Sequence, residues 1–470
     1  MKLRYLASIL GALCSLLHAH AQPLPARQTT LPGTYRISAG TQLSYETPLA
    51  PLAGYLREYI NVGKASDSMS ADDAIVLSTD PTLGGEAFRL TVLPQRIEIA
   101  GGSYGGVFNG VQALFRLLPA EIYAKNCPLP VEIACTKVED APRFPYRGMM
   151  LDVARTWIDA AGVKRYIDLL SYHGINKLHL HLSDDEGWRI EIRSHPELTE
   201  IGGFRGGDSP VRPVYGKWDE KYGGDYTQDE MRGLIRYAAA RNIEIIPEID
   251  LPGHSRNIAS VHPEIRCNYP PDTVSTNGYD YRSAWCVARE ENYALLGDIL
   301  GELCELFPSE YIHVGGDEVD MSQWERCPDC RALMKREGMT DPHRLEDLFM
   351  ERMAAILRSH GKRPAVWNEA VRTGAFSREC RVHGWESVKA CLDATAKGYR
   401  TVVMPGQYFY FDMRQSPRED GHDWAAIFDA KKVYGFGFTE FSPEQMRNVE
   451  GLQGAFFSEA YVSHEPEKPD

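Results

Sequence analysis

Short apolar segments recur from about residue 146 to the end of the chain, and stretches long enough for a helix separate most of them. The segments read RGMMLDVAR, KLHLHLSDD, IEIIPEID, YIHVGGDE, PAVWNEA, RVHGWES, RTVVMPG and GAFFSEA. Apolar runs of this length are typical of strands buried on both faces of a parallel sheet. Eight strand–helix repeats predict an α/β fold, a (β/α)8 TIM barrel. An open doubly wound sheet would need a glycine-rich phosphate-binding turn after its first strand, and the sequence has none.

The residues before these repeats follow a different pattern. Strand-like AIVLSTD and FRLTVLPQRIEIAG precede a helical YGGVFNGVQALFRLLP, which Pro119 ends. We therefore expect a small α+β domain over residues 22–140, followed by the barrel over residues 141–470.

The first 21 residues have the features of a signal peptide. Lys2 and Arg4 precede an apolar stretch that is too short to span a bilayer, and Ala19-His20-Ala21 provides a cleavage site. We expect an exported protein, located in the periplasm, on the cell surface or in the medium. No later segment is predicted to cross a membrane.

Composition excludes some partners. The net charge is −14, and no cluster of Lys and Arg is present. Nucleic acids and anionic membranes both require such clusters, so neither is expected as a partner.

Ionisable residues stand at or just after the end of seven of the eight barrel segments; RTVVMPG is the exception. They are Asp152, Arg155, Asp184, Asp185, Asp250, Asp317, Glu318, Glu369, Glu386 and Glu459. Because the carboxyl ends of barrel strands converge on one face, these residues predict a site there.

The adjacent acids Asp317 and Glu318 are the most informative. Two such charges about 5 Å apart, at an effective dielectric near 20, repel by roughly 3 kcal/mol. Repulsion and partial burial would raise one pKa by roughly two pH units, which keeps a proton on the pair near neutrality.

Acids, an arginine and two tryptophans at one end of the predicted barrel are suited to binding a sugar. Carboxylates and Arg155 can bind several hydroxyl groups, and indole rings stack on the apolar face of a pyranose. Trp367 and Trp385 end the fifth and sixth predicted strands. Hydrolysis of a glycosidic bond needs a protonated acid beside the leaving oxygen. Adjacent residues are poorly placed to flank that bond as acid and nucleophile, which favours a nucleophile supplied by the substrate. A metal site built from these acids is less favoured, because they are spread around this end of the barrel.

Four motifs, HVGGDEV, KLHLHLSDDEGWRIEI, RGMMLDVAR and PEIDLPGHS, resemble those of glycoside hydrolase family 20, the β-N-acetylhexosaminidases. The resemblance runs from about residue 30 to the end of the chain. It implies an exo-acting, retaining glycosidase that removes terminal N-acetylglucosamine or N-acetylgalactosamine from a glycan or chitooligosaccharide, without a metal or cofactor. The D-x-x-D-x-D-x-E signature of family 18 chitinases, which also use the acetamido group, is absent.

The resemblance also implies roles for individual residues. Glu318 resembles the general acid/base. Asp317 resembles the residue that orients the 2-acetamido group while its carbonyl oxygen attacks C1 to give an oxazolinium intermediate, and Tyr410 resembles the tyrosine that hydrogen-bonds this oxygen. Arg155, Asp412 and Glu459 resemble the residues that bind the hydroxyl groups of the sugar. Trp367 and Trp385 resemble the walls of the pocket. Asp184, Asp250 and His254 resemble the polar network that supports the acid pair.

The chain departs from the family pattern in two places. Phe457 stands where the family usually has a tryptophan, which predicts a looser sugar subsite. The chain also ends at Asp470, shortly after the last strand segment, so the barrel is expected to lack its last helix. An uncovered strand would expose apolar surface. It could recruit a second chain, and a dimer is therefore one option for the oligomeric state. It also leaves open the alternative of an inactive, sugar-binding barrel.

Cysteines give less guidance. Ten are present, of which Cys14 lies in the expected signal peptide. The C-x-x-C at Cys327 and Cys330 has no second pair or histidine pair nearby in sequence, so a local disulfide or two structural thiols is favoured over zinc. Export makes two further disulfides candidates, Cys127 with Cys135 and Cys267 with Cys286.

Overall fold

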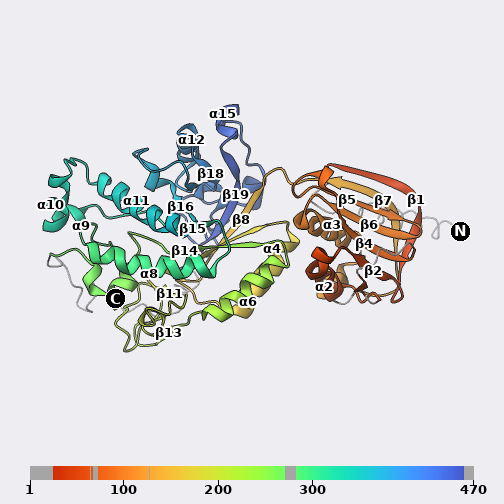
Figure 1. The fold of residues 1–470 in the computed structure, drawn as a ribbon, viewed down its shortest axis with the longest axis horizontal. Coiled ribbons are helices and arrows are strands. Elements are labelled where there is room, and N and C mark those ends of the chain that lie inside the picture. Colours follow the sequence, from red (N-terminus) through yellow and green to blue (C-terminus); the bar gives the residue numbers. More distant parts are fainter. Residues whose placement is uncertain (1–24, 64, 67–71, 126, 270–281, 460–470) are drawn as a thin grey trace. The chain divides into compact units, whose positions relative to one another are not determined.

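A computed structural model describes residues 25–459, except residues 64, 67–71, 126 and 270–281 (Figure 1). The chain divides into two compact units, of which the first ends at Arg143 and the second begins at Phe144; residues 240–242 group with the first. The expected signal segment and any helix after Glu459 lie outside the described residues.

The second unit is a closed barrel of eight parallel strands, as the sequence predicts. Every predicted segment contributes a strand, and the eighth strand begins earlier than expected, at Val449. The strands, in chain order, are β8 (Tyr146–Asp152), β9 (Lys177–His181), β14 (Glu244–Glu248), β15 (Tyr311–His313), β16 (Arg363–Trp367), β17 (Arg381–Gly384), β18 (Arg400–Val403) and β19 (Val449–Phe456). The ring closes where β19 pairs with β8.

Helices flank the barrel unevenly. The longest are α4 (Ala160–Tyr172), α6 (Gln228–Ala239), α8 (Glu290–Leu306) and α11 (His343–Ser359), followed by α10 (Pro328–Arg336) and α12 (Val388–Ala396). The remaining helices of this unit are short: α5 (Glu197–Glu200), α7 (Arg256–Val261), η4 (Pro263–Ile265), α9 (Ser322–Arg326), η5 (Asn368–Val371), α13 (Gly406–Phe409), α14 (Ala430–Tyr434) and α15 (Pro443–Met446). Thr227 and Glu230 cap α6 reciprocally: each side chain accepts the other's backbone N–H, at 3.1 and 3.0 Å.

The loop between β9 and α6 contains two small antiparallel ladders. One pairs β10 (Ser183–Asp184) with β11 (Gly187–Trp188), and the other pairs β12 (Phe204–Arg205) with β13 (Tyr222–Gly223). The first ladder fixes the backbone around Asp184, at the end of the barrel where the ionisable residues gather.

The first unit is a seven-stranded mixed sheet with the order β1-β7-β5-β6-β4-β2-β3. Its strands are β1 (Arg27–Ile37), β2 (Gln42–Tyr45), β3 (Ala65–Ser66), β4 (Ala74–Thr79), β5 (Phe88–Leu93), β6 (Arg96–Gly101) and β7 (Val131–Asp140). Its helices are η1 (Thr47–Leu49), α2 (Ala50–Tyr59), η2 (Pro81–Leu83), α3 (Tyr104–Arg116) and η3 (Ala120–Ala124), and α3 packs on β5 and β6 over a core of its own.

All nine cysteines from Cys127 to Cys391 are buried free thiols. The predicted pairs, Cys127 with Cys135 and Cys267 with Cys286, therefore form no disulfide in the structure, and neither do Cys327 and Cys330. Among the described residues, no helix has both the length and the apolar character needed to cross a membrane.

Closure of the barrel depends on close approach between β19 and β8. Gly451 pairs with Tyr146, and a Cβ added at Gly451 would lie 1.7 Å from the Tyr146 carbonyl oxygen. We predict that Gly451→Ala lowers the free energy of unfolding by about 3 kcal/mol or more, because the strands must move apart. Urea unfolding followed by circular dichroism measures this.

The matched control is Gly297→Ala on α8, where an added Cβ would meet nothing within 4 Å. This control should be neutral or stabilising by up to about 1 kcal/mol, since alanine favours helix. Equal stability of the two variants would contradict the account of closure.

Candidate active site

The acid pair Asp317 and Glu318 lies on the loop that follows β15. Gly315 and Gly316 take φ of +68° and +94°, which disfavours any residue with a Cβ. A Cβ at Gly315 would also lie 1.9 Å from Asp250 Oδ1. The two glycines of HVGGDEV thus let this loop pass against the loop after β14. Glu318 itself has φ of +46°, an uncommon conformation for a residue with a side chain.

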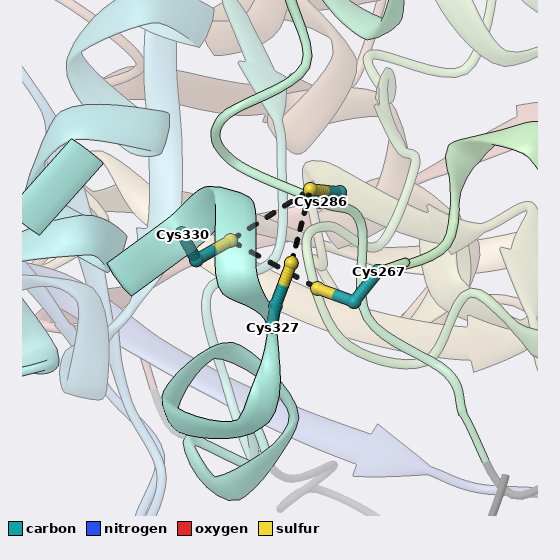
Figure 2. Close-up of side chains that lie close together, drawn as sticks. All are labelled: Cys267, Cys286, Cys327 and Cys330. Atoms are coloured by element: carbon teal, nitrogen blue, oxygen red, sulfur yellow. Dashed lines mark hydrogen bonds between the residues drawn. The ribbon is translucent and has the colours of Figure 1, made fainter. Parts of the chain in front are cut away.

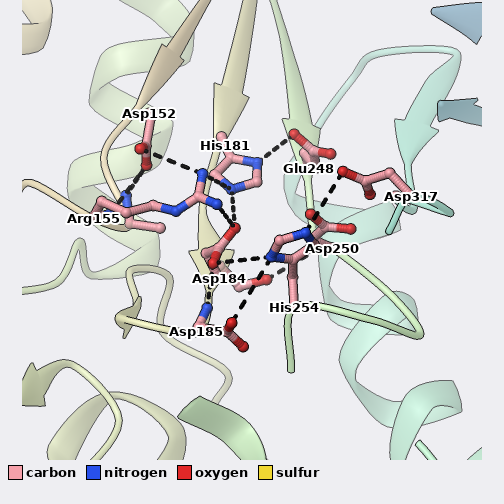
Figure 3. A network of polar contacts seen from close by, with 12 residues as sticks. Asp152, Arg155, His181, Asp184, Asp185, Glu248, Asp250, His254 and Asp317 are labelled. Atoms are coloured by element: carbon pink, nitrogen blue, oxygen red, sulfur yellow. Dashed lines mark hydrogen bonds and ion pairs between the residues drawn. The ribbon is translucent and has the colours of Figure 1, made fainter. Parts of the chain in front are cut away.

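His254 connects the acid pair to the rest of the site, and Figure 3 shows its ring between Asp184 and Asp317. Its Nε2 lies 3.4 Å from Glu318 Oε2 and 3.8 Å from Asp317 Oδ2, and its Nδ1 lies 3.4 Å from Asp184 Oδ1. Burial alone would lower the pKa of His254, but Asp184 and Glu318 together raise it well above its usual value. His254 therefore supplies a positive charge between three carboxylates.

Arg155 and Asp184 form the second part of this network. Arg155 Nη2 lies 2.7 Å from Asp184 Oδ2 and 3.9 Å from Glu459 Oε1. Burial opposes ionisation of Asp184, yet Arg155 and His254 hold its pKa well below the usual range. Figure 3 shows the arginine, the histidine and Asp184 in one continuous network. The structure thus brings together residues from the ends of β8, β9, β14 and β15.

The two members of the acid pair differ in their electrostatics. Burial, followed by the charge of Glu248, raises the pKa of Asp317 to about 6, and Asp250 hydrogen-bonds it. Burial and the charge of Asp317 also raise the pKa of Asp250 well above its usual value. The hydrogen bond from His254 lowers the pKa of Glu318, whose side chain is 58% exposed. The sequence predicts a proton-holding carboxyl in this pair, and the raised pKa of Asp317 assigns that role to Asp317.

Aromatic side chains line the side of the site formed by β16 to β19. Trp385 stacks on Tyr410 with a centroid distance of 6.0 Å and an interplanar angle of 16°. Phe457 lies 5.1 Å from the Tyr410 ring, and the Arg155 guanidinium lies 5.3 Å from the Phe457 ring. Trp367 is 1% exposed and packs on His313 at 4.6 Å. Trp385, Tyr410 and Phe457 therefore form a wall, with Trp367 deeper in the barrel.

Asp412 and Glu459 are only partly satisfied by neighbouring groups. Each has one buried carboxylate oxygen without a hydrogen-bond partner, Asp412 Oδ1 and Glu459 Oε2. Burial, with the charge of Glu459, raises the pKa of Asp412 to about 7. Asp412 and Phe457 also line a hollow of about 340 Å³, and its lining does not include Asp317 or Glu318. Two buried acceptors without donors are what a hydroxylated ligand would satisfy.

A set of buried histidines beneath the site was not singled out by sequence reasoning. Glu248 Oε2 lies 2.6 Å from His181 Nδ1 and 3.0 Å from His179 Nε2, while Glu248 Oε1 lies 3.0 Å from His313 Nδ1. Of these residues, His179, Glu248 and His313 form a group of the kind that can hold a metal ion. The alternation in KLHLHL was a usable signal, since residues two apart in a strand share one face.

Three further acids have supporting positions. Asp152 accepts backbone N–H groups of Ala154, Arg155 and Ser458. Glu369 accepts the Trp385 indole N–H at 3.2 Å and the Glu318 backbone N–H at 3.4 Å. Asp185 accepts the backbone N–H of Arg256, while Asp184 points into the network, as strand alternation predicts.

Comparison with sequence families identifies both units. The sequence model of "Glycosyl hydrolase family 20, catalytic domain" matches residues 144–467, and that of "Glycosyl hydrolase family 20, domain 2" matches residues 20–141. A β-hexosaminidase of Vibrio furnissii is 36% identical over 447 residues, which cover 93% of this chain and 72% of the relative. A β-hexosaminidase of Porphyromonas gingivalis is 30% identical, covering 94% of this chain and 58% of the relative.

Solved structures agree in fold. The Vibrio harveyi GH20 exo-β-N-acetylglucosaminidase, in complex with N-acetylglucosamine, superposes with a TM-score of 0.85 at 34% identity, covering 94% of this chain and 70% of that one. The GH20 β-N-acetylhexosaminidase of Streptomyces coelicolor superposes with a TM-score of 0.77 at 28% identity, covering 93% and 86%. The chain therefore belongs to glycosyl hydrolase family 20 and, with that family, to the glycoside hydrolases.

Proposed function

We propose that this chain is an exo-acting, retaining β-N-acetylhexosaminidase that removes terminal N-acetylglucosamine or N-acetylgalactosamine by substrate-assisted catalysis. The observation that carries the proposal is the contact of a single imidazole nitrogen, His254 Nε2, with both Asp317 and Glu318. Relatives and solved structures named β-hexosaminidase support the reaction class.

The shared contact with His254 bears on which group acts as the nucleophile. A retaining enzyme with its own nucleophile places two carboxyl groups on opposite sides of the scissile bond, about 5–5.5 Å apart. Asp317 and Glu318 are adjacent in sequence and bind the same nitrogen, so they lie on the same side. The remaining candidate nucleophile is the acetamido oxygen of the sugar, which can reach C1 from within the substrate.

Each residue then has a chemical task. The more exposed Glu318 is accessible to the leaving group and donates its proton there. Asp317, anchored by Asp250, accepts the acetamido N–H and balances the positive charge that develops on the ring formed with C1. Tyr410 donates a hydrogen bond from its hydroxyl to the acetamido oxygen and keeps its proton, and Arg155 binds sugar hydroxyls while Asp184 fixes its position.

The Glu318 task predicts a dependence on the leaving group. Glu318→Gln should lower kcat/KM on the β-linked disaccharide of N-acetylglucosamine by about 10²–10⁴-fold, because an alkoxide must be protonated as it leaves. An aryl glycoside with an activated phenol needs less protonation and should lose less.

The control for this experiment is Glu291→Gln, an exposed residue in the first turn of α8, which should leave both rates unchanged. Equal losses of Glu318→Gln on the disaccharide and on the aryl glycoside would argue against its role as the acid.

The electrostatics predict a pH profile. As pH rises, the acid pair of the free enzyme loses the Glu318 proton first and its last proton at about pH 6, the raised pKa of Asp317. Catalysis requires one proton on the pair, carried by Glu318 once substrate is bound, since contact with the acetamido N–H favours ionised Asp317.

We therefore expect kcat/KM for the disaccharide to fall above about pH 6 and to fall again at acid pH, where both groups are protonated. Initial rates in buffers of constant ionic strength measure this. Asp317→Asn should remove the limb near pH 6 and lower the maximum rate. A wild-type profile without that limb would contradict the assignment.

We also propose that the protein is exported. The support is the basic and apolar pattern of residues 1–21, which lie outside the described residues.

A further inference from the structure

Four cysteines from distant parts of the barrel unit converge on one point (Figure 2). The Sγ atom of Cys286 lies 3.7 Å from that of Cys330 and 3.9 Å from that of Cys327, and the Sγ atom of Cys267 lies 3.9 Å from that of Cys330. All four Sγ atoms lie within 4.8 Å of one another. In the sequence, Cys327 and Cys330 are separated by two residues in C-P-D-C, and Cys267 and Cys286 are 19 positions apart.

The distances fit a tetrahedral metal centre. Zinc bonds thiolate sulfur at about 2.3 Å, so the corners of a regular tetrahedron around it lie about 3.8 Å apart. A disulfide requires about 2.05 Å between two sulfurs, and none of the three contacts approaches this. No pair is favoured over the others, as expected if the four sulfurs share one centre.

We propose that Cys267, Cys286, Cys327 and Cys330 bind a structural zinc ion. Binding replaces four S–H bonds by four Zn–S bonds and releases four protons to solvent, which leaves a centre of charge −2. Four sulfur ligands in this geometry select zinc over the hard cations calcium and magnesium.

The surroundings fit a closed centre. Each of the four cysteines is at most 2% exposed, and they belong to the same buried core as Trp285 and Trp324, both fully buried. A site with four protein ligands and no access for water or substrate is structural. Cys327 is also the N-cap residue of α10, whose helix dipole favours negative charge at that end.

Groups around the ligands hold the ligand backbone in place. Arg282 donates to the Cys267 carbonyl at 3.4 Å and to the Tyr269 carbonyl at 2.6 Å. Asn292 Nδ2 donates to the Cys286 carbonyl at 3.0 Å. The arginine brings positive charge toward the centre, and such outer groups orient metal ligands.

The ion would link two loops that carry the active site. Cys267 and Cys286 follow β14 and α7, while Cys327 and Cys330 follow β15 and the acid pair. Between the ligands, the Trp324 indole donates to the Trp285 carbonyl at 2.9 Å, and the Trp285 indole donates to Ser255 Oγ at 3.0 Å. Ser255 directly follows His254. The zinc ion therefore acts as a positioning element for His254, in addition to its contribution to stability.

Metal content tests the proposal directly. Full-length protein purified from zinc-supplemented cells should carry one zinc per chain by inductively coupled plasma mass spectrometry. Titration of the thiols with p-hydroxymercuribenzoate should release that zinc, read with 4-(2-pyridylazo)resorcinol. Cys330→Ser should lose most of the zinc. Cys304→Ser, which changes a buried cysteine on α8 outside the cluster, should keep it.

Wild-type protein provides a second readout that does not depend on how the variants fold. Substitution with Co²⁺ should give the sulfur-to-cobalt charge-transfer and d–d absorption bands of tetrahedral thiolate coordination. The denatured and alkylated chain should have the mass of four free cysteines at these positions. Two disulfides in the mass spectrum, iron in place of zinc, or free thiols with no metal after incubation with zinc would each overturn the proposal.

The link to His254 has its own measurement. If Cys330→Ser folds, its melting temperature should fall by several degrees. Its kcat/KM should also fall, and the limb near pH 6 that Asp317 and Glu318 give to the pH profile should shift. A lower melting temperature with an unchanged pH profile would overturn the positioning role and leave only the stabilising one.

Discussion

The contacts of His254 organise the site. One imidazole meets Asp184 through Nδ1 and both members of the acid pair through Nε2. Asp184, Glu248 and Asp250 are buried and the Asp317 side chain is 15% exposed, and burying carboxylates without partners would cost many kcal/mol. The charges of His254, Arg155 and His181 offset this for Asp184 and Glu248, while Asp250 and Asp317 have raised pKa values instead.

This arrangement explains the unusual backbone beside it. Glu318 takes a left-handed conformation, and so does His254, with φ of +47°. Strain of this kind persists only where surrounding contacts fix it. For Glu318 these contacts are the turn at Gly315 and Gly316 and the backbone hydrogen bond to Glu369. For His254 they include the bonds of Ser255 to Ser283 and Trp285.

Much of the fold and of the site followed from local patterns in the sequence. All eight barrel strands were predictable because buried parallel strands are continuous apolar runs, and barrel topology then places their ends together. Arg155, Asp184, Asp250, His254, Asp317 and Glu318 are in contact for that reason. Their individual roles still rest on the family resemblance.

Other features could not be predicted, because they depend on distances between residues far apart in the chain. Cys267 and Cys330 are separated by 63 positions and meet only because neighbouring strands bring their loops together. The order of the two pKa values depends on the burial of Asp317 and on the hydrogen bond from His254 to Glu318, and both follow from the packing of distant segments. The pairing of Glu248 with three histidines likewise depends on side chains from β9, β14 and β15 meeting inside the barrel.

The most direct test of the central claim varies the nucleophile within the substrate. Aryl β-glycosides of glucosamine that carry acetyl, monofluoroacetyl, difluoroacetyl or trifluoroacetyl groups on nitrogen differ in the electron density of the carbonyl oxygen. If this oxygen attacks C1 while Asp317 stabilises the product ring, kcat/KM should fall at each added fluorine. A rate that does not change along the series would show that the acetamido group is not the nucleophile and would contradict the account.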